Sequence, residues 1–259
     1  MGRNVLVSIQ NLTKVFEKDD TEITALQRLT IDVFEGELLC IIGPTGCGKT
    51  TLLRILAGLE KPSSGTIRFE GQEIRGPAAE RSMVFQEFAL FPWRNVEKNI
   101  SFGLEIKSLT KEKKNEIVNG FVSLANLKGF EHSHPRDLSS GMKQRVAIMR
   151  ALATDPKLLL MDEPFGSLDA QTRNIMQKEL LRIWAETGKT IVFVTHSVDE
   201  AVLLACRIVI LTSRPASLRR VLEVEIPHPR DIMSGESIQI RAGILKELEA
   251  EVQKSLMTH

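Results

Sequence analysis

Short apolar runs alternate along this chain with segments in which apolar residues recur at helical spacing. Leu38–Ile42, Leu158–Met161 and Ile191–Val194 are continuous apolar runs of strand length, which is typical of strands buried on both faces. Between them lie helical patterns at Lys49–Ala57, closed by Gly58, and at Ser140–Ala153. The alternation predicts an α/β fold with a mostly parallel sheet flanked by helices.

The first third of the chain has a different pattern. Val5–Ile9 and Leu29–Phe34 alternate between apolar and polar residues, as half-buried strands do, and Thr66–Phe69 is a further short strand ending at Gly71. These segments predict an antiparallel β layer beside the parallel strands. Three more strands are predicted at Ser82–Phe85, Ile208–Thr212 and Val221–Ile226.

Helical patterns dominate two other regions. Between 110 and 127 the residues Ile117, Phe121, Leu124 and Ala125 recur at helical spacing, so a mostly helical subdomain is expected over about 88–155. After a link rich in proline and arginine, an amphipathic helix is predicted from about Glu236. We therefore expect a main domain over residues 1–230 and a C-terminal helical extension over 231–259.

Composition narrows the class of protein. The 259 residues are 42% hydrophobic and 26% charged, which is sufficient for a globular core, and the net charge of +1 gives no general attraction for nucleic acid. Cys40, Cys47 and Cys206 lie far apart, which favours reduced thiols over disulfides. No apolar run approaches the ~18 residues of a spanning helix, and Met1–Val5 does not begin a signal peptide. We expect a cytoplasmic protein that acts at a membrane, if at all, through a partner.

A phosphate-binding loop is predicted between the strand at 38–42 and the helix at 49–57. The loop is Gly43-Pro44-Thr45-Gly46-Cys47-Gly48-Lys49-Thr50, which matches G-x-x-x-x-G-K-[ST] throughout. Its glycines allow backbone N–H groups to surround phosphate oxygens, and the following helix adds its positive N-terminal end. Lys49 is expected to reach the β- and γ-phosphates, and the Thr50 hydroxyl to bind Mg²⁺. The alternative, a glycine-rich turn that matches by chance, does not explain its place between strand and helix.

Two carboxylates follow the apolar strand at 158–161. A buried parallel strand brings its C-terminal residues to the ligand edge of the sheet, where a phosphate-binding loop also lies. Asp162 is therefore expected to hold Mg²⁺, commonly through water. Glu163 points in a different direction and is the candidate general base that polarises the attacking water.

Two further strand ends carry polar side chains. His196 follows the strand at 190–195 and can reach the same edge to hydrogen-bond a γ-phosphate, although a lone histidine is more often structural. Gln86 ends the strand at 82–85 and can approach Mg²⁺ or the attacking water. Its position alone does not decide between a role and none.

The segment Leu138-Ser139-Ser140-Gly141-Met142-Lys143-Gln144-Arg145 resembles the signature of ABC ATPases, usually written LSGGQ. From about Val5 to Thr212 the chain is similar to that family, because it has the family's motifs in the family's order. These motifs are the phosphate-binding loop, Gln86, this signature, Asp162-Glu163-Pro164, Ser167-Leu168-Asp169 and His196. The resemblance implies an ATPase with ATP and Mg²⁺ as ligands.

The resemblance also implies a dimer. In the family the signature caps the γ-phosphate held by the loop of a second subunit, so Ser139, Ser140 and Gly141 are expected to bind the partner's nucleotide. A helix N-terminus that carries hydroxyls is an anion site, which agrees with that role. Asp169 is expected to cross the interface. Ser140 replaces the usual glycine and puts the rate of hydrolysis in doubt, whereas Thr45 for serine is a mild change.

An aromatic residue upstream of the loop stacks on adenine in this family. The chain has no tyrosine, so Phe16 is the candidate, with a buried core phenylalanine as the alternative. The full set expected to bind nucleotide is Phe16, Gly43, Pro44, Thr45, Gly46, Cys47, Gly48, Lys49, Thr50, Thr51, Ser139, Ser140, Gly141 and Asp169. The expected catalytic residues are Glu163, His196, Gln86 and Lys49, and the metal ligands are Thr50, Gln86 and Asp162.

Three segments are most similar to importer ATPases of the nitrate, sulfonate, taurine and bicarbonate group: Gln86–Trp93, Glu186–Thr190 and Ile226–Asp231. Such importers take solute from a separate binding protein and pass it through a two-chain permease. The resemblance implies a peripheral subunit at the cytoplasmic face of the membrane. A permease helix is expected to dock near Phe88–Trp93, unless these apolar residues belong to the core.

Other classes fit less well. Ribosome-associated ABC ATPases usually carry two cassettes in one chain, and those of DNA repair insert long coiled coils, for which Lys49 and Leu138 are too close. A nucleotide-dependent scaffold without turnover would leave Glu163 idle. The transported solute does not contact this kind of subunit, so the sequence does not identify it.

Overall fold

The computed structural model describes residues 3–18 and 21–257. Two parts of the predictions lie outside the described residues. They are Met1 and Gly2, where no signal peptide was expected, and Thr258 and His259, which end the expected C-terminal extension. The chain divides into two compact units, one formed by Met1–Pro77 with Gly188–His259 and the other by Ala78–Thr187.

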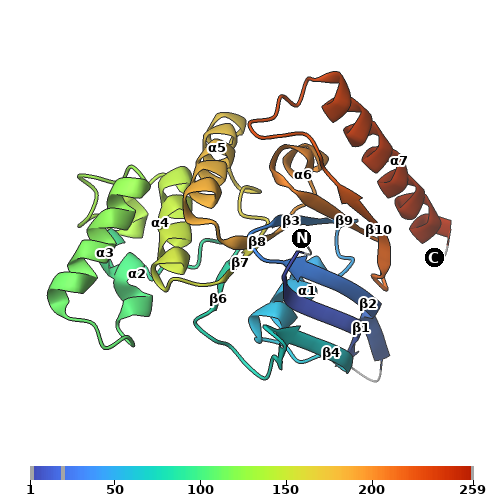
Figure 1. The fold of residues 1–259 in the computed structure, drawn as a ribbon, viewed down its shortest axis with the longest axis horizontal. Helices are drawn as coiled ribbons and strands as arrows, with labels where there is room; N and C mark the ends of the chain where they lie inside the picture. Colours follow the sequence, from blue (N-terminus) through green and yellow to red (C-terminus); the bar gives the residue numbers. More distant parts are fainter. Residues whose placement is uncertain (1–2, 19–20, 258–259) are drawn as a thin grey trace. The chain divides into compact units, whose positions relative to one another are not determined.

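An antiparallel sheet forms much of the first unit (Figure 1). Its strands are β1 (Val5–Lys18), β2 (Thr21–Phe34), β4 (Ser64–Phe69) and β5 (Gln72–Glu73), in the order β2-β1-β4-β5. β1 and β2 are longer than predicted, because they pair along their whole length from Val5↔Phe34 to Lys18↔Thr21. Register irregularities interrupt this pairing and break the alternation on which the prediction relied.

Buried parallel strands form the rest of the sheet structure in this unit. β3 (Leu38–Ile42) pairs in parallel with β8 (Thr190–Val194) and with β9 (Arg207–Leu211), and every residue of the three strands is buried. β10 (Leu218–Glu223) pairs antiparallel with β9. It begins three residues earlier than predicted, because Leu218 already pairs with Leu211.

Three helices complete the first unit. α1 (Lys49–Ala57) ends at Gly58, as predicted, which has a φ of 77° and whose added Cβ would lie 2.2 Å from the Gly76 carbonyl oxygen. α6 (Val198–Leu204) contacts α7 (Gly235–Met257), the long C-terminal helix in Figure 1.

The second unit is mostly helical. Its strands, β6 (Arg81–Val84) and β7 (Leu158–Asp162), pair in parallel. Its helical elements are α2 (Val96–Ile100), η1 (Ser101–Leu104), α3 (Lys111–Leu124), η2 (Pro135–Asp137), α4 (Ser140–Ala153) and α5 (Ala170–Thr187) (Figure 1). The α/β class, the antiparallel layer and the helical segment are confirmed.

The buried face of α3 is rotated from the one that the apolar spacing indicated. Val118 and Val122 are each 2% exposed, whereas Ile117, Phe121 and Leu124 are only partly buried. Ala125, directly after the helix, is buried as the spacing predicted. The α3 sequence has apolar residues at both sets of positions, and packing against neighbouring helices selects the smaller β-branched side chains.

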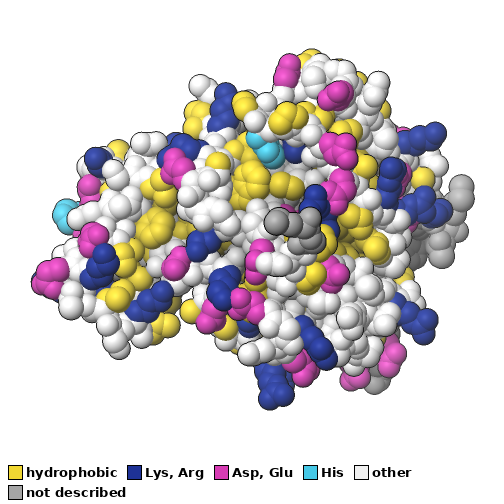
Figure 2. Space-filling model, in the orientation of Figure 1, with side chains coloured by type: hydrophobic (Ala, Val, Ile, Leu, Met, Phe, Trp, Pro, Cys, Tyr) yellow, Lys and Arg dark blue, Asp and Glu magenta, His cyan; other side chains and the backbone are white. Residues whose placement is uncertain are grey.

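Neither unit contains, among its described residues, a helix that is long and apolar enough to cross a bilayer. On the face drawn in Figure 2, lysine and arginine side chains are interspersed with aspartate and glutamate.

Candidate nucleotide site

The phosphate-binding loop joins β3 to α1 in the first unit. Gly46 and Gly48 have φ angles of 74° and 126°, which side chains with a Cβ rarely adopt. A Cβ on Gly48 would also lie 2.9 Å from the carbonyl oxygen of Ala25 on β2. No side chain caps the N-terminus of α1, so its first N–H groups are available for an anion.

Lys49 lies inside this loop. Its side chain is buried, and its Nζ donates to the carbonyl oxygens of Gly43 at 2.9 Å and Pro44 at 3.1 Å. The next two residues, Thr50 and Thr51, are exposed and partly buried respectively. Among the described residues, this ammonium group is held by neutral carbonyl oxygens alone, which a phosphate can outcompete.

Arg214 contacts the phosphate-binding loop, and the sequence did not indicate this contact. Its Nε and Nη2 donate to the Gly46 carbonyl oxygen at 3.1 and 2.6 Å, from a position shortly after β9. The two residues are 168 positions apart, so no local pattern could connect them. The guanidinium fixes the loop and adds positive charge beside it.

Cys47 is 1% exposed, and its Sγ would lie 3.0 Å from a Cβ on Gly43. Burial raises the pKa of this thiol, while the nearby Lys49 partly opposes the shift. Because the thiolate is the reactive form, alkylation of Cys47 by iodoacetamide should be slower at pH 7.5 than that of a free thiol, and should accelerate as pH rises. Peptide mass spectrometry over time would measure it. Rapid labelling at neutral pH would contradict the buried position.

Phe16 lies on β1, whose partner strand β2 approaches the phosphate-binding loop at Leu26. Leu26 on β2 pairs with Lys14, two residues before Phe16, and its Cδ2 would lie 3.0 Å from a Cβ on Gly48. Phe16 is 37% exposed. The alternative of a buried core phenylalanine is therefore wrong.

His196 lies at the same edge of the parallel strands as the loop. It follows β8, which pairs with β3 through Ile41↔Val194, and its side chain is exposed. The first unit thus places His196 at the strand edge that carries the phosphate-binding loop, and Phe16 on the strand beside β2, which reaches Gly48.

The acidic pair and Gln86 lie together at one edge of the second unit. Asp162 is the last residue of β7 and is 6% exposed, and Glu163 follows it, partly buried, with a φ of 43°. Val84 on β6 pairs with Met161, so the exposed Gln86 lies at the carboxyl end of the neighbouring strand. The left-handed backbone turns Glu163 away from the direction of the strand, at a cost of about 1–3 kcal/mol for such conformations.

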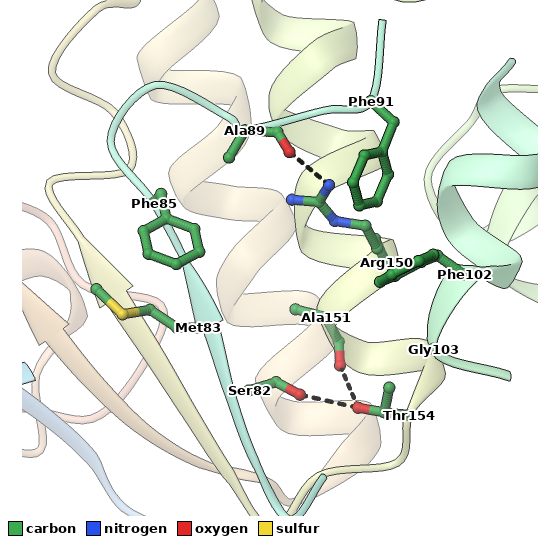
Figure 3. Close-up of a pocket in the computed structure, with 10 residues that line it drawn as sticks. All are labelled: Ser82, Met83, Phe85, Ala89, Phe91, Phe102, Gly103, Arg150, Ala151 and Thr154. Carbon is green, nitrogen blue, oxygen red and sulfur yellow. Dashed lines mark hydrogen bonds between the residues drawn. The ribbon is translucent and has the colours of Figure 1, made fainter. Parts of the chain in front are cut away.

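Arg150 on α4 holds the loop that follows Gln86. Phe88 and Ala89 both have positive φ angles, and the Arg150 guanidinium donates to their carbonyl oxygens at 3.0 and 2.6 Å. Figure 3 shows this guanidinium pointing from α4 toward the loop, beside the ring of Phe91. No pattern in the sequence indicated this contact.

A pocket of about 310 Å³ opens beside this loop (Figure 3). Its lining is Ser82, Met83, Phe85, Ala89, Phe91, Phe102, Gly103, Arg150, Ala151 and Thr154. The rings of Phe91 and Phe102 are 4.6 Å apart, and Trp93, 5.6 Å from Phe91, is 71% exposed. These aromatic residues form an exposed surface, so the alternative that the whole segment belongs to the core is wrong.

The signature residues begin α4. Ser139 is the N-cap, and its hydroxyl accepts a hydrogen bond from the Met142 N–H at 3.3 Å. Ser139 is exposed and Ser140 partly so, whereas Gly141 is buried. A Cβ on Gly141 would lie 2.6 Å from Thr172 Cγ2 of α5, which explains why a glycine stands there.

Asp169 caps α5 in its own chain. Its carboxylate accepts a hydrogen bond from the Thr172 N–H at 2.9 Å. Hydrogen bonds from Thr172 lower the pKa of this exposed carboxyl group. The carboxylate is therefore fixed at the start of α5.

Known proteins resemble this chain over most of its length. A family model described as ABC transporter matches residues 26–166. The chain is 50% identical, over 97% of its own length and 94% of the relative's, to an uncharacterized ABC transporter ATP-binding protein of Methanocaldococcus jannaschii. It is 45% identical to the aliphatic sulfonates import ATP-binding protein SsuB of Bacillus licheniformis, with 94% of each chain covered. The nitrate import ATP-binding protein NrtD of Synechocystis is 41% identical, with 91% of this chain and 88% of the relative covered.

A solved structure has the same fold. It is the dimeric structure of a post-hydrolysis state of an ATP-binding cassette bound to ADP and Pi, which has a TM-score of 0.75 and 29% identity. It covers 85% of this chain, and this chain covers all of that one.

Proposed function

Because the chain belongs to the ABC transporter family of ATP-binding proteins, we propose that it hydrolyses ATP to drive an importer whose permease is a separate membrane protein. The observation that carries this proposal is the exposed aromatic surface beside the loop after Gln86. It provides a docking position directly after a residue assigned to the nucleotide site.

ATP binds, in this proposal, with its phosphates in the loop between β3 and α1. The N–H groups of the loop and the Lys49 ammonium hold the β- and γ-phosphates. In the second unit, Asp162 and Gln86 lie at the carboxyl ends of the adjacent strands β7 and β6, and they offer a carboxylate and an amide oxygen, the oxygen ligands that Mg²⁺ prefers. The Thr50 hydroxyl is the third ligand in this proposal. Mg²⁺ would neutralise charge on the β- and γ-phosphate oxygens.

Hydrolysis is assigned to in-line attack of water on the γ-phosphate. Glu163 accepts the proton of the attacking water as general base, while His196 donates a hydrogen bond to the γ-phosphate and Gln86 orients the water. The N-terminus of α4 from a second subunit, with Ser139, Ser140 and Gly141, caps the same phosphate. The dimeric cassette with ADP and Pi supports such a pair of subunits.

The proposed partner is a permease with a cytoplasmic helix that docks on the aromatic surface of Phe91, Trp93 and Phe102. The loop that Arg150 holds joins Gln86 to this surface. It couples the nucleotide site to the permease in this proposal, because a displacement of Gln86 also displaces the loop. Arg150 would transmit the movement from α4. The chain would then work at the cytoplasmic face of the membrane.

The proposed cargo is a small anion of the nitrate, sulfonate and taurine type. Two relatives that are 41% and 45% identical are named as import proteins for nitrate and for aliphatic sulfonates. A solute-binding protein and the permease would choose among such anions, since both contact the solute and this subunit does not.

An uptake assay in the native organism tests the proposal. A strain that lacks the gene is complemented with the wild type or with Trp93→Glu, and uptake of labelled nitrate, taurine and an alkanesulfonate is measured. Loss of a central interface tryptophan costs roughly 2 kcal/mol or more, so uptake should fall roughly 30-fold. The ATPase rate of the purified subunit should not change, because Trp93 lies outside the assigned nucleotide residues.

Met233→Glu is the matched control, because Met233 is 75% exposed and lies in the other unit. It should leave uptake unchanged. If the deletion strain takes up all three anions normally, the assignment of the cargo is wrong. If Trp93→Glu restores uptake as well as the wild type does, the docking surface is wrong.

A further inference from the structure

A lysine lies against the aromatic ring assigned to adenine. The Nζ of Lys14 is 4.7 Å from the centroid of the Phe16 ring. Both residues belong to β1, and the ammonium lies over the face of the ring. The lysine therefore occupies one side of the ring, while Phe16 as a whole residue remains 37% exposed.

Lys14 is held firmly in this position. Its side chain is only 12% exposed, and its Nζ donates to Glu60 Oε1 at 2.7 Å and to the Lys61 carbonyl oxygen at 3.0 Å. The hydrogen bond from Lys14 also lowers the pKa of the Glu60 carboxyl group. A surface lysine without such partners would be mobile, so these contacts set the ammonium where it meets the ring.

The same contacts connect the ring to the helix of the phosphate-binding loop. Glu60 follows the end of α1, and the N–H groups of Leu59 and Glu60 donate to the Arg54 carbonyl oxygen at 2.8 and 3.2 Å. Lys49 is the first residue of that helix. Lys14 thus links the C-terminal end of α1 to the ring of Phe16.

We propose that Lys14 is a positioning residue for the nucleobase, which fixes the Phe16 ring relative to α1 and polarises it for stacking on adenine. This inference rests on the proposed role of Phe16. A cation beside an aromatic ring is attracted to its π electrons and draws them toward itself. The opposite side of the ring then repels the π electrons of a stacked purine less strongly.

A double-mutant cycle separates this role from a general effect on the site. Dissociation constants of Mg-ATP and of Mg-tripolyphosphate, which lacks the nucleoside, are measured for the wild type, Lys14→Met, Phe16→Leu and the double variant. Lys14→Met should weaken ATP binding by roughly 3-fold, the size expected of an exposed cation–π contact, and leave tripolyphosphate binding unchanged. In the Phe16→Leu background the same substitution should have no effect on ATP.

Two controls make the result specific. Lys61→Met removes one exposed charge from the neighbouring position and should leave ATP affinity unchanged, whereas Lys14→Arg keeps a cation and should retain most of it. Equal weakening of ATP and tripolyphosphate by Lys14→Met would overturn the inference, because Lys14 would then act on the phosphate loop. An unchanged ATP affinity of Phe16→Leu would instead show that the ring does not bind adenine. That outcome would refute the assignment of Phe16, and the inference with it.

Discussion

Replacing Glu163 with glutamine is expected to reduce kcat for ATP hydrolysis by about 10²–10⁴-fold, the usual contribution of a general base. The substitution removes the proton acceptor and keeps the size of the side chain, so the left-handed backbone at this residue is preserved. The dissociation constant of Mg-ATP should change little, since Glu163 acts on the water. Phosphate release and fluorescent-nucleotide titration would measure the two effects separately.

The same variant should reveal the shared site. With hydrolysis blocked, ATP should hold two subunits together, and light scattering should detect a dimer only in the presence of Mg-ATP. Glu116→Gln, which makes the same chemical change on the exposed face of α3, should hydrolyse ATP at the parent rate. If Glu163→Gln also hydrolyses ATP at the parent rate, Glu163 is not the base.

The elements that bear the site could be predicted because local chemistry marks their ends. α1 and α4 have the predicted bounds, since Gly58 provides the left-handed C-terminal residue of α1 and Ser139 the N-cap of α4. β3 also has its predicted bounds, because both of its faces are buried and its apolar run is continuous. The resemblance to ABC ATPases, which rested on motifs in these elements, is confirmed by the family match.

The residues that hold the site in place could not be predicted. Arg214 reaches the phosphate-binding loop across 168 positions, and Arg150 reaches Phe88 and Ala89 across 62 and 61. Each guanidinium satisfies backbone carbonyl oxygens, which every residue has, so no pattern of side chains reveals the partner. Such contacts appear only when the fold brings distant segments together.

The strain at Glu163 belongs to the same class of hidden features. A positive φ at a residue with a long side chain is unfavourable in isolation, and the surrounding fold must maintain it. The Glu163 carbonyl oxygen accepts a hydrogen bond from the Gly166 N–H at 3.1 Å, which closes a turn directly after β7. This turn separates the directions of Asp162 and Glu163, which allows one carboxylate to serve the metal and the other the water.

Replacing Lys49 with alanine is the second change with a large expected effect, and it should weaken Mg-ATP binding by roughly 100-fold. Hydrogen bonds to charged groups contribute about 1.5–3 kcal/mol each, and Lys49 is assigned to two phosphates. In the part of the chain that the structure describes, its Nζ is bound to the neutral carbonyl oxygens of Gly43 and Pro44 and to no carboxylate that would compete with the nucleotide. Isothermal titration with ATP and with ADP would measure the loss, which should be larger for ATP because only ATP carries the γ-phosphate.

Arg54→Ala is the control, since Arg54 is an exposed cation on the same helix, five residues further on. Arg54→Ala lowers the charge of α1 by the same amount as Lys49→Ala, but it removes no group from the phosphate-binding loop. Because exposed charges contribute little, ATP affinity should stay within about 2-fold of the wild type. Thermal melting without nucleotide checks that Lys49→Ala still folds, because the side chain is buried. If folded Lys49→Ala protein binds ATP as the wild type does, the phosphates bind elsewhere. The roles assigned to Phe16, His196 and the signature residues would then be wrong, because each was assigned relative to a nucleotide in this loop.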